Sequence, residues 1–302
     1  MGLTSSHFQR TITELHGADG VAWLARLPVL IERCATRWSV VVEPPFGPLS
    51  YNYVAPAVRA DGARVVLKAG VPNREIETEV AALSHYDGRG CVRLLESDTD
   101  AGVFLLERAV PGETLLTVSD TEATEIAAGV MRKFWRSVPD EHPFPTAADW
   151  SRGFERLRRE FDGGTGPFDS RLVERAETLF GELMASANEP VVLHGDLHHW
   201  NILAAEREPW LAIDPKGVIG EPAYEVGAFL RNPMENLMSG AGPRVTLERR
   251  VAIFEERLGL DRKRMLDWTF AQAVLSAWWF YEDHGRGWQP TMEFASVVET
   301  LG

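Results

Sequence analysis

The stretch from residue 191 to residue 203 constrains this chain more than any other part of its sequence. The apolar run Val191-Val192-Leu193 leads directly into a polar loop, and the chain becomes apolar again at Ile202. The loop carries five side chains that can transfer protons or bind ions, namely His194, Asp196, His198, His199 and Asn201. A purely structural loop rarely needs so many such groups, so we expect a strand, a reactive loop and a second strand.

The spacing inside this loop indicates a particular chemistry. Asp196 and Asn201 stand in the order Asp-x-x-x-x-Asn, which kinases use. There the Asp orients or deprotonates the attacking hydroxyl, and the Asn gives an oxygen to Mg²⁺. Asp214 follows a second apolar run, residues 210–213. Strands at 202–204 and 210–213 would form a hairpin, placing Asp214 beside Asn201 as a second Mg²⁺ ligand.

The string His-Gly-Asp-Leu-His-His-Trp-Asn at 194–201, followed by Asp214, resembles the aminoglycoside phosphotransferase family, which has a protein-kinase-like fold. Residues 214–225 resemble its streptomycin 6-kinase and hydroxyurea phosphotransferase branch, as do residues 83–90 and 105–108. The resemblance spans about residues 64 to 290. It implies Asp196 as the catalytic residue, with Asn201 and Asp214 as the metal ligands.

The resemblance also implies a nucleotide site for ATP. Lys68 ends a strand and should contact the α and β phosphates. Glu79, on the following helix, should pair with Lys68, although Glu75 and Glu77 are competitors on that helix. Glu79 is preferred because its Glu-Val-Ala-Ala-Leu context matches the family pattern.

Two further segments should surround the nucleotide. Residues 107–109, including Glu107 and Ala109, fall where a hinge would offer backbone groups to the adenine. Residues 45–52, including Ser50, would cover the phosphates, with Gly47 as the one glycine in place of a glycine-rich loop.

We expect a small cationic substrate. The net charge of −13 repels nucleic acid and anionic membranes and attracts cations. Glu282 and Asp283 end an apolar helix, where negative charge opposes the helix dipole. Carboxylates there face the substrate in related kinases, although plain exposure explains them equally well. His198 and Glu225 are the other substrate candidates.

These expectations lead to one preferred reaction, the phosphorylation by Mg-ATP of a hydroxyl on a streptomycin-type aminoglycoside, a function in antibiotic resistance. Hydroxyurea or another small alcohol is the alternative acceptor. A protein acceptor is disfavoured because Gly195 replaces the arginine before Asp196 and only about six residues separate Asp214 from Glu221, too few for an activation loop.

Two other classes of site are less favoured. Zinc bound by His194, His198 and His199 is unfavourable because adjacent histidines cannot easily face one cation and no cysteine assists. A non-catalytic pseudokinase should lack part of the set formed by Lys68 and the Asp196 loop, yet the set is complete.

The pattern of elements predicts two lobes with a cleft, and the resemblance implies that they form an α+β, protein-kinase-like fold. Residues 1–108 form an N-terminal nucleotide-binding lobe, and residues 109–302 form a mainly helical catalytic and substrate-binding lobe. Strands are expected at 39–43, 53–55, 64–68, 91–96 and 103–107. Helices are expected at 73–86, 121–138, 149–160, 169–187, 246–258, 262–283 and 291–300, beside an apolar helical face at 23–38.

The sequence predicts a cytoplasmic protein. Cys34 and Cys91 lie among apolar residues without a CxxC partner, which suits a reducing compartment. The N-terminus shows no signal peptide, and no stretch of about 20 residues is apolar enough to cross a bilayer. We expect a monomer that binds neither nucleic acid nor membranes.

Overall fold

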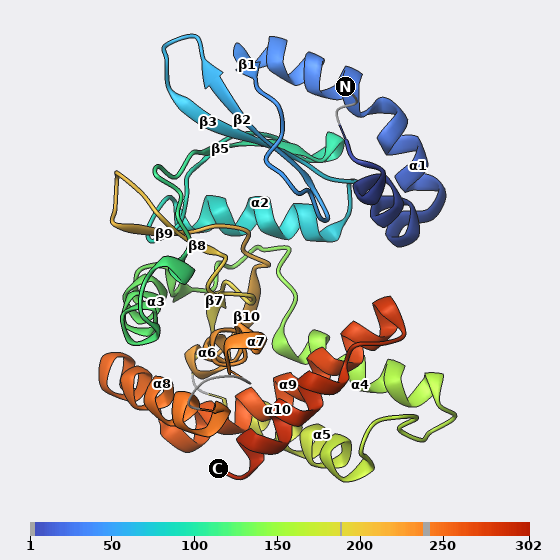
Figure 1. Ribbon diagram of the computed structural model, residues 1–302, viewed down its shortest axis with the longest axis vertical. Helices are drawn as coiled ribbons and strands as arrows, with labels where there is room; N and C mark the ends of the chain where they lie inside the picture. Colours follow the sequence, from blue (N-terminus) through green and yellow to red (C-terminus); the bar gives the residue numbers. More distant parts are fainter. Residues whose placement is uncertain (1–3, 188, 238–241) are drawn as a thin grey trace. The chain divides into compact units, whose positions relative to one another are not determined.

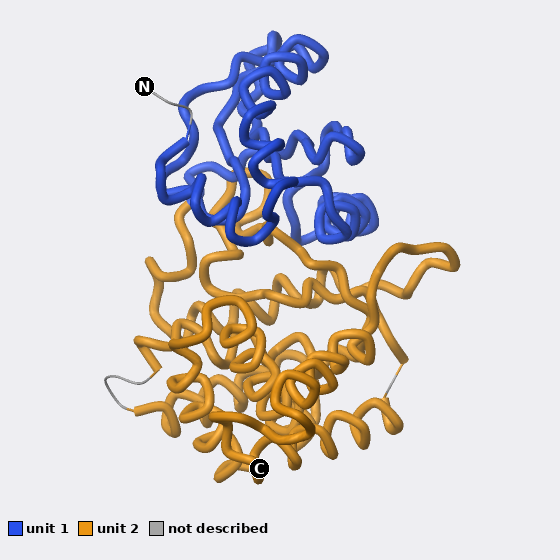
Figure 2. The backbone as a smooth tube through the Cα atoms, turned by 90° about the vertical axis from the view of Figure 1, so that its right-hand side faces the viewer, with its two compact units in different colours: residues 1–112 blue, residues 113–302 orange. Residues whose placement is uncertain are grey.

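The computed structural model describes residues 4–187, 189–237 and 242–302, and it divides into two compact units. Unit 1 is Met1–Gly112 and unit 2 is Glu113–Gly302 (Figure 2). The division follows Gly112, whereas the sequence places the lobe boundary after residue 108.

Unit 1 contains one antiparallel sheet and two long helices (Figure 1). The strand order is β1-β2-β3-β5-β4. The elements in chain order are α1 (Ser6–Arg37), β1 (Val40–Val42), β2 (Tyr53–Arg59), β3 (Arg64–Ala69), α2 (Arg74–Tyr86), β4 (Leu94–Asp98), a 3₁₀ turn (Thr99–Ala101) and β5 (Val103–Glu107).

The two faces of this sheet have different partners. Val65, Leu67 and Ala69 of β3 belong to the apolar core that includes the buried residues of α1. Successive strand side chains point to opposite faces, so Lys68 points to the other face, where α2 supplies Glu79. This alternation is the reason a lysine within an apolar strand becomes buried.

Unit 2 is mainly helical, with two small antiparallel sheets of order β10-β7-β6 and β8-β9. Its strands are β6 (Arg136–Ser137), β7 (Val191–Leu193), β8 (Ile202–Ala204), β9 (Trp210–Ala212) and β10 (Val218–Gly220). A 3₁₀ turn (Leu115–Thr117) comes first. The helices are α3 (Asp120–Phe134), α4 (Ala147–Glu160), α5 (Ser170–Ala185), α6 (Pro222–Leu230), α7 (Met234–Leu237), α8 (Pro243–Leu258), α9 (Arg262–His284) and α10 (Gln289–Glu299).

Most predicted elements are confirmed, and the differences have local causes. The strand expected at 91–96 lies at Leu94–Asp98, after a turn in which Gly88 and Gly90 have positive φ. The first helix begins at Ser6, far before the apolar face predicted at 23–38, and kinks at Gly17. α6 is absent from the predicted helices, because a helix that is buried on all sides shows no amphipathic period.

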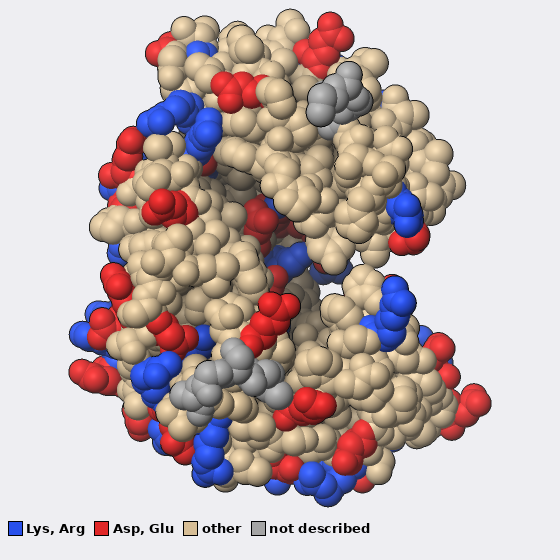
Figure 3. All heavy atoms as spheres, in the orientation of Figure 1, with Lys and Arg blue, Asp and Glu red and all other residues tan. Residues whose placement is uncertain are grey.

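Charges on the visible surface are mixed. Figure 3 shows Asp and Glu side chains scattered over one face with Lys and Arg among them. Within the described parts of the chain, no helix is both long and apolar enough to cross a membrane.

Candidate functional site

The reactive loop of unit 2 is tied to the segment that follows β9. β8 pairs with β9 in the register Ile202↔Ala212, which confirms the predicted hairpin. The N–H of Ile213 donates to the carbonyl of Asn201 at 2.9 Å, and the N–H of Lys216 donates to the carbonyl of His194 at 2.8 Å. These bonds on both sides of Asp214 hold it beside the loop.

Asp196 is fixed by its backbone. Its N–H donates to Nδ1 of His194 at 3.2 Å, and its carbonyl accepts a bond from the side-chain amide of Asn201 at 2.9 Å. The Asp196 side chain is 34% exposed, and its Oδ2 lies 3.7 Å from Nε2 of His198. The backbone bonds therefore position the carboxylate and leave its oxygens partly accessible.

His194 has a structural role with one defined tautomer. Its Nε2 lies 2.8 Å from the carbonyl of Ile213, so Nε2 must carry the hydrogen, while Nδ1 accepts from Asp196. Burial lowers the pKa of His194 to about 4. The imidazole is therefore neutral at physiological pH and links the two halves of the site.

Asn201 and Asp214 could hold a hard cation. Because the Asn201 amide nitrogen donates to Asp196, its carbonyl oxygen can serve a metal. Asp214 has φ +59°, in the left-handed region that Asp tolerates better than most residues. Within the described residues, no group of three or more His, Cys, Asp and Glu side chains is arranged for a metal. Two oxygen donors suit Mg²⁺, which takes its remaining ligands from phosphates and water.

Glu225 is buried against the backbone of the reactive loop. It is 1% exposed, and its two oxygens accept the N–H groups of His194 at 2.6 Å and Gly195 at 2.9 Å. Burial raises its pKa to about 7, although both amides favour the ionised form. This geometry gives Glu225 a positioning role in the loop, and its predicted substrate role stays a prediction.

Replacing Glu225 with Gln tests this role through pH. The folded pKa is about 7, above the ordinary value of 4.5, so folded protein binds the proton more tightly. The stability that this group contributes is complete below pH 4.5 and is lost as pH rises to 7. We expect the unfolding free energy of wild type to fall by about 3 kcal/mol relative to Glu225→Gln across this range. Urea titrations at several pH values measure this difference in unfolding free energy.

The exposed Glu155→Gln of α4 is the matched control for that comparison, since water surrounds its side chain in the folded protein. A difference between wild type and Glu225→Gln that is independent of pH would contradict the buried, titrating carboxylate.

Unit 1 contains the predicted ion pair. Nζ of Lys68 lies 2.6 Å and 2.8 Å from the two carboxylate oxygens of Glu79. The two residues are 2% and 7% exposed. Nζ of Lys68 also lies 5.6 Å from the ring centroid of Phe104, its register partner on β5. The competitors Glu75 and Glu77 stand in the first turn of α2.

The other predicted nucleotide residues lie in the β1–β2 connection and at the end of β5. Ser50 is exposed in the β1–β2 connection. Glu107 ends β5, and its N–H donates to the carbonyl of Arg93 at 2.9 Å, while Ala109 lies just beyond. The guanidinium of Arg108 lies 5.6 Å from the ring centroid of Phe46, which joins this end of β5 to the β1–β2 connection.

The three loop histidines face three environments. His194 bonds to Ile213, His198 approaches Asp196, and His199 stacks on Phe229 with ring centroids 4.1 Å apart. Burial lowers the pKa of His199 to about 3. The three rings do not converge on one cation.

The carboxylates at the end of α9 are already engaged. Glu282 receives two bonds from Arg156 of α4, at 2.6 Å and 2.8 Å. Asp283 also interacts electrostatically with Arg156. The sequence offers no sign of this partner, which lies 126 residues away. A substrate cation would compete with Arg156 for Glu282.

Comparison with known proteins agrees with this geometry. The sequence profile described as aminoglycoside/hydroxyurea antibiotic resistance kinase matches residues 37–284. The chain belongs to this family. It is 33% identical over 276 residues to a streptomycin 6-kinase from Streptomyces glaucescens, covering 91% of this chain and 89% of the relative. It is 34% identical over 294 residues to a hydroxyurea phosphotransferase from Kitasatospora aureofaciens, covering 95% and 82%.

The solved structures establish the fold of this kinase. A choline kinase from Streptococcus pneumoniae superposes with a TM-score of 0.64 at 15% identity, covering 91% of this chain and 99% of that one. The protein-kinase-like α+β fold is confirmed. The chain is thus a small-molecule phosphotransferase whose family acts on hydroxyl groups.

The kinase contains a buried arginine that the sequence interpretation missed. Arg250 of α8 is 1% exposed, and its Nη1 donates to the carbonyls of Phe229 at 2.9 Å and Asn232 at 2.6 Å. Its Nε donates to Asp120 at 3.0 Å, and its Nη2 lies 3.5 Å from Nε2 of His199. Arg250 therefore fastens the end of α6 to the reactive loop. The sequence signal that could have revealed its burial is its position on the apolar face of α8.

We expect Arg250→Met to lower the unfolding free energy by about 3–5 kcal/mol, because the substitution leaves Asp120 and several carbonyls without their donor. Chemical denaturation measures the loss. Arg249→Ala is the matched control, since Arg249 also bonds Asp120, at 2.7 Å, from a side chain that is 41% exposed. That control should cost no more than about 1 kcal/mol. Equal losses in both variants would contradict the buried role.

Arg231 is a second cation that the sequence interpretation missed. It follows α6, its guanidinium donates to Gln272 at 3.4 Å, and its charge interacts with that of Asp196. Burial lowers the pKa of Arg231, and the carboxylate of Asp196 opposes that shift. The kinase thus brings a positive charge to Asp196 from the end of α6, although Gly195 precedes Asp196 in sequence.

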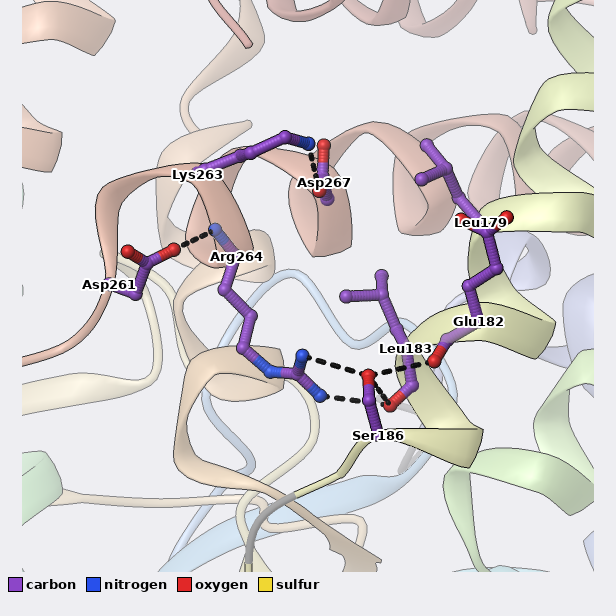
Figure 4. Close-up of a pocket in the computed structure, with 8 residues that line it drawn as sticks. All are labelled: Leu179, Glu182, Leu183, Ser186, Asp261, Lys263, Arg264 and Asp267. Carbon is purple, nitrogen blue, oxygen red and sulfur yellow. Dashed lines mark hydrogen bonds and ion pairs between the residues drawn. The ribbon is translucent and has the colours of Figure 1, made fainter.

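A hollow of about 400 Å³ between α5 and α9 is a different feature (Figure 4). Its cations are bound to protein groups. Arg264 donates to Glu221 at 2.7 Å and to the carbonyl of Leu183 at 2.9 Å, and Lys263 pairs with Asp267 at 2.7 Å. This network joins helices, and we assign the hollow no ligand.

Proposed function

We propose that this kinase transfers the γ-phosphoryl group of Mg-ATP to a hydroxyl of a streptomycin-type aminoglycoside and so confers antibiotic resistance. One observation carries the proposal. The Asp196, Asn201 and Asp214 arrangement stands in a chain that is 33% identical to a streptomycin 6-kinase over 91% of its length.

Asp196 is proposed as the catalytic residue. Its carboxylate would accept the hydroxyl proton as the hydroxyl oxygen attacks the γ-phosphorus and the bond to the β–γ bridging oxygen breaks, releasing ADP. The side chain is 34% exposed while its backbone is held on both sides. Phosphoryl transfer depends mainly on such positioning and on electrostatics.

Asn201 and Asp214 are proposed to hold Mg²⁺ through side-chain oxygens. The ion would neutralise charge on the nucleotide phosphates when bound. Lys68 is proposed to bind the α and β phosphates, with Glu79 fixing its Nζ from 2.6 Å. Glu107 and Ala109 are proposed at the adenine, and Ser50 at the phosphates.

Hydroxyurea is the second candidate acceptor. The specific support is the relative named hydroxyurea phosphotransferase, which is 34% identical over 95% of this chain. Hydroxyurea is small and uncharged, whereas streptomycin carries guanidinium groups. The protein's net charge of −13 favours the cation.

An ATP-consumption assay with each acceptor tests the proposal. Wild type should consume ATP with streptomycin, and Asp196→Ala should not. The Asp162→Asn variant is the matched control, because Asp162 is an exposed aspartate with φ +51° at the end of α4, where Asn is also tolerated. Turnover with hydroxyurea alone would shift the assignment to the second candidate. If neither streptomycin nor hydroxyurea supports turnover, both candidate acceptors are excluded.

We also propose that the kinase works as a cytoplasmic monomer. Cys34 and Cys91 are buried thiols, which a reducing compartment preserves. Light scattering after size-exclusion chromatography should give the mass of one chain, 33.7 kDa. A mass of two chains would contradict the monomer.

A further inference from the structure

Two tryptophans of unit 2 lie together beside the reactive loop. Trp150 belongs to α4 and Trp279 to α9, two helices that lie side by side in Figure 1. Their rings meet edge to face, with centroids 5.6 Å apart and an interplanar angle of 88°. Both side chains are only half-buried.

Trp150 contacts the residue that precedes Asp196. Gly195 has φ +83°, and a Cβ built on it would lie 2.8 Å from Cη2 of Trp150. A side chain at 195 would therefore collide with the indole. The absence of that side chain lets the six-membered ring of Trp150 lie against the backbone of the reactive loop.

Burial distinguishes this pair from the other tryptophans nearby. Trp268 and Trp278 of α9 are 1% and 2% exposed, as expected of core residues. Trp150 rests on the buried ring of Tyr224 at a centroid distance of 6.1 Å and keeps part of its surface accessible. A large apolar ring that stays partly accessible next to Asp196 is available to a ligand.

The charges around this pair favour aromatic recognition of a cation. Arg156, on α4 two turns after Trp150, neutralises Glu282, on α9 one turn after Trp279. Glu282 is therefore a poor single anchor for a guanidinium. The faces of Trp rings attract cations without a counter-charge, and a planar guanidinium also stacks on them.

We propose that Trp150, packed against Trp279, forms an aromatic wall that stacks a planar guanidinium group of the acceptor beside Asp196. This inference rests on the proposed aminoglycoside kinase activity and specifies its substrate class as a ring compound that carries guanidinium. Trp150 acts on affinity for the acceptor and has no part in binding the nucleotide.

The test compares Trp150→Leu, Trp150→Phe and the matched control Phe280→Leu, which removes an aromatic ring that is 44% exposed on the same helix as Trp279. We expect Trp150→Leu to raise KM for streptomycin about 3- to 30-fold, the range of one cation–π contact. Its kcat and its KM for ATP should change less than 3-fold by the same reasoning. Trp150→Phe should restore most of the affinity, and Phe280→Leu should match wild type.

Binding measured without turnover separates this inference from the proposed function. Streptomycin is titrated into Asp196→Ala while tryptophan fluorescence is followed, and the same is done with Asp196→Ala/Trp150→Phe. A streptomycin-dependent change that disappears with Trp150 supports the wall even if wild type transfers no phosphate. A KM in Trp150→Leu within 2-fold of wild type, or a fluorescence change of undiminished size without Trp150, overturns it. If Trp150→Leu does not fold, the Trp150→Phe titration decides alone.

Discussion

Asp196→Asn should lower kcat by about 10²- to 10⁴-fold, the usual contribution of a positioned general base. The amide matches the carboxylate in shape but cannot accept a proton. The loop should keep its form, because His194 and Asn201 hold Asp196 through its backbone N–H and carbonyl. Affinity for Mg-ADP should therefore stay within a few-fold of wild type. Steady-state kinetics and calorimetric titration measure the two quantities.

The exposed Asp162→Asn variant controls for loss of one negative charge. Its kcat should equal that of wild type. A kcat of Asp196→Asn within 10-fold of wild type would contradict the catalytic role of Asp196, whatever the change in KM.

Glu79→Gln should destabilise unit 1 by about 3 kcal/mol or more, because it removes the charge that compensates a buried ammonium. The side chains of Lys68 and Glu79 are 3% and 9% exposed, so water cannot replace the lost partner. Glu96→Gln is the matched control, since Glu96 pairs with Arg59 at 2.9 Å but is 42% exposed. That control should cost no more than about 1 kcal/mol.

A double variant separates stability from function at this pair. Lys68→Met/Glu79→Leu replaces the buried charges with apolar groups, and such exchanges are often neutral for folding. We expect stability close to that of wild type in urea titrations, with an ATP KM raised at least 10-fold because a phosphate contact of about 1.5–3 kcal/mol is lost. A double variant with the ATP KM of wild type would show that Lys68 is only structural.

Local patterns predicted the parts of the site that local interactions form. The hairpin joining Asn201 to Asp214 follows from two apolar runs with a short connection, and β8 and β9 pair as expected. The pairing of Lys68 with Glu79 was predicted from the family resemblance, and the structure shows that β3 and α2 bring the two side chains together.

Contacts distant in sequence were beyond such prediction. Glu225 supports His194 from 31 residues away, and Arg250 reaches His199 from 51 residues away. A carboxylate or guanidinium is ambiguous in a sequence until its partner is known. The same ambiguity applies to Glu282, whose partner Arg156 the sequence did not reveal and whose role toward a substrate stays a prediction.

The most direct test of the central claim is the identity of the reaction product. Purified wild type and Asp196→Ala are incubated with Mg-ATP and streptomycin, and the acceptor is followed by mass spectrometry and phosphorus NMR. We predict that wild type alone forms streptomycin bearing one phosphate ester on a ring hydroxyl, in step with ADP release. ADP release without a phosphorylated acceptor, or the same product from Asp196→Ala, would contradict the account.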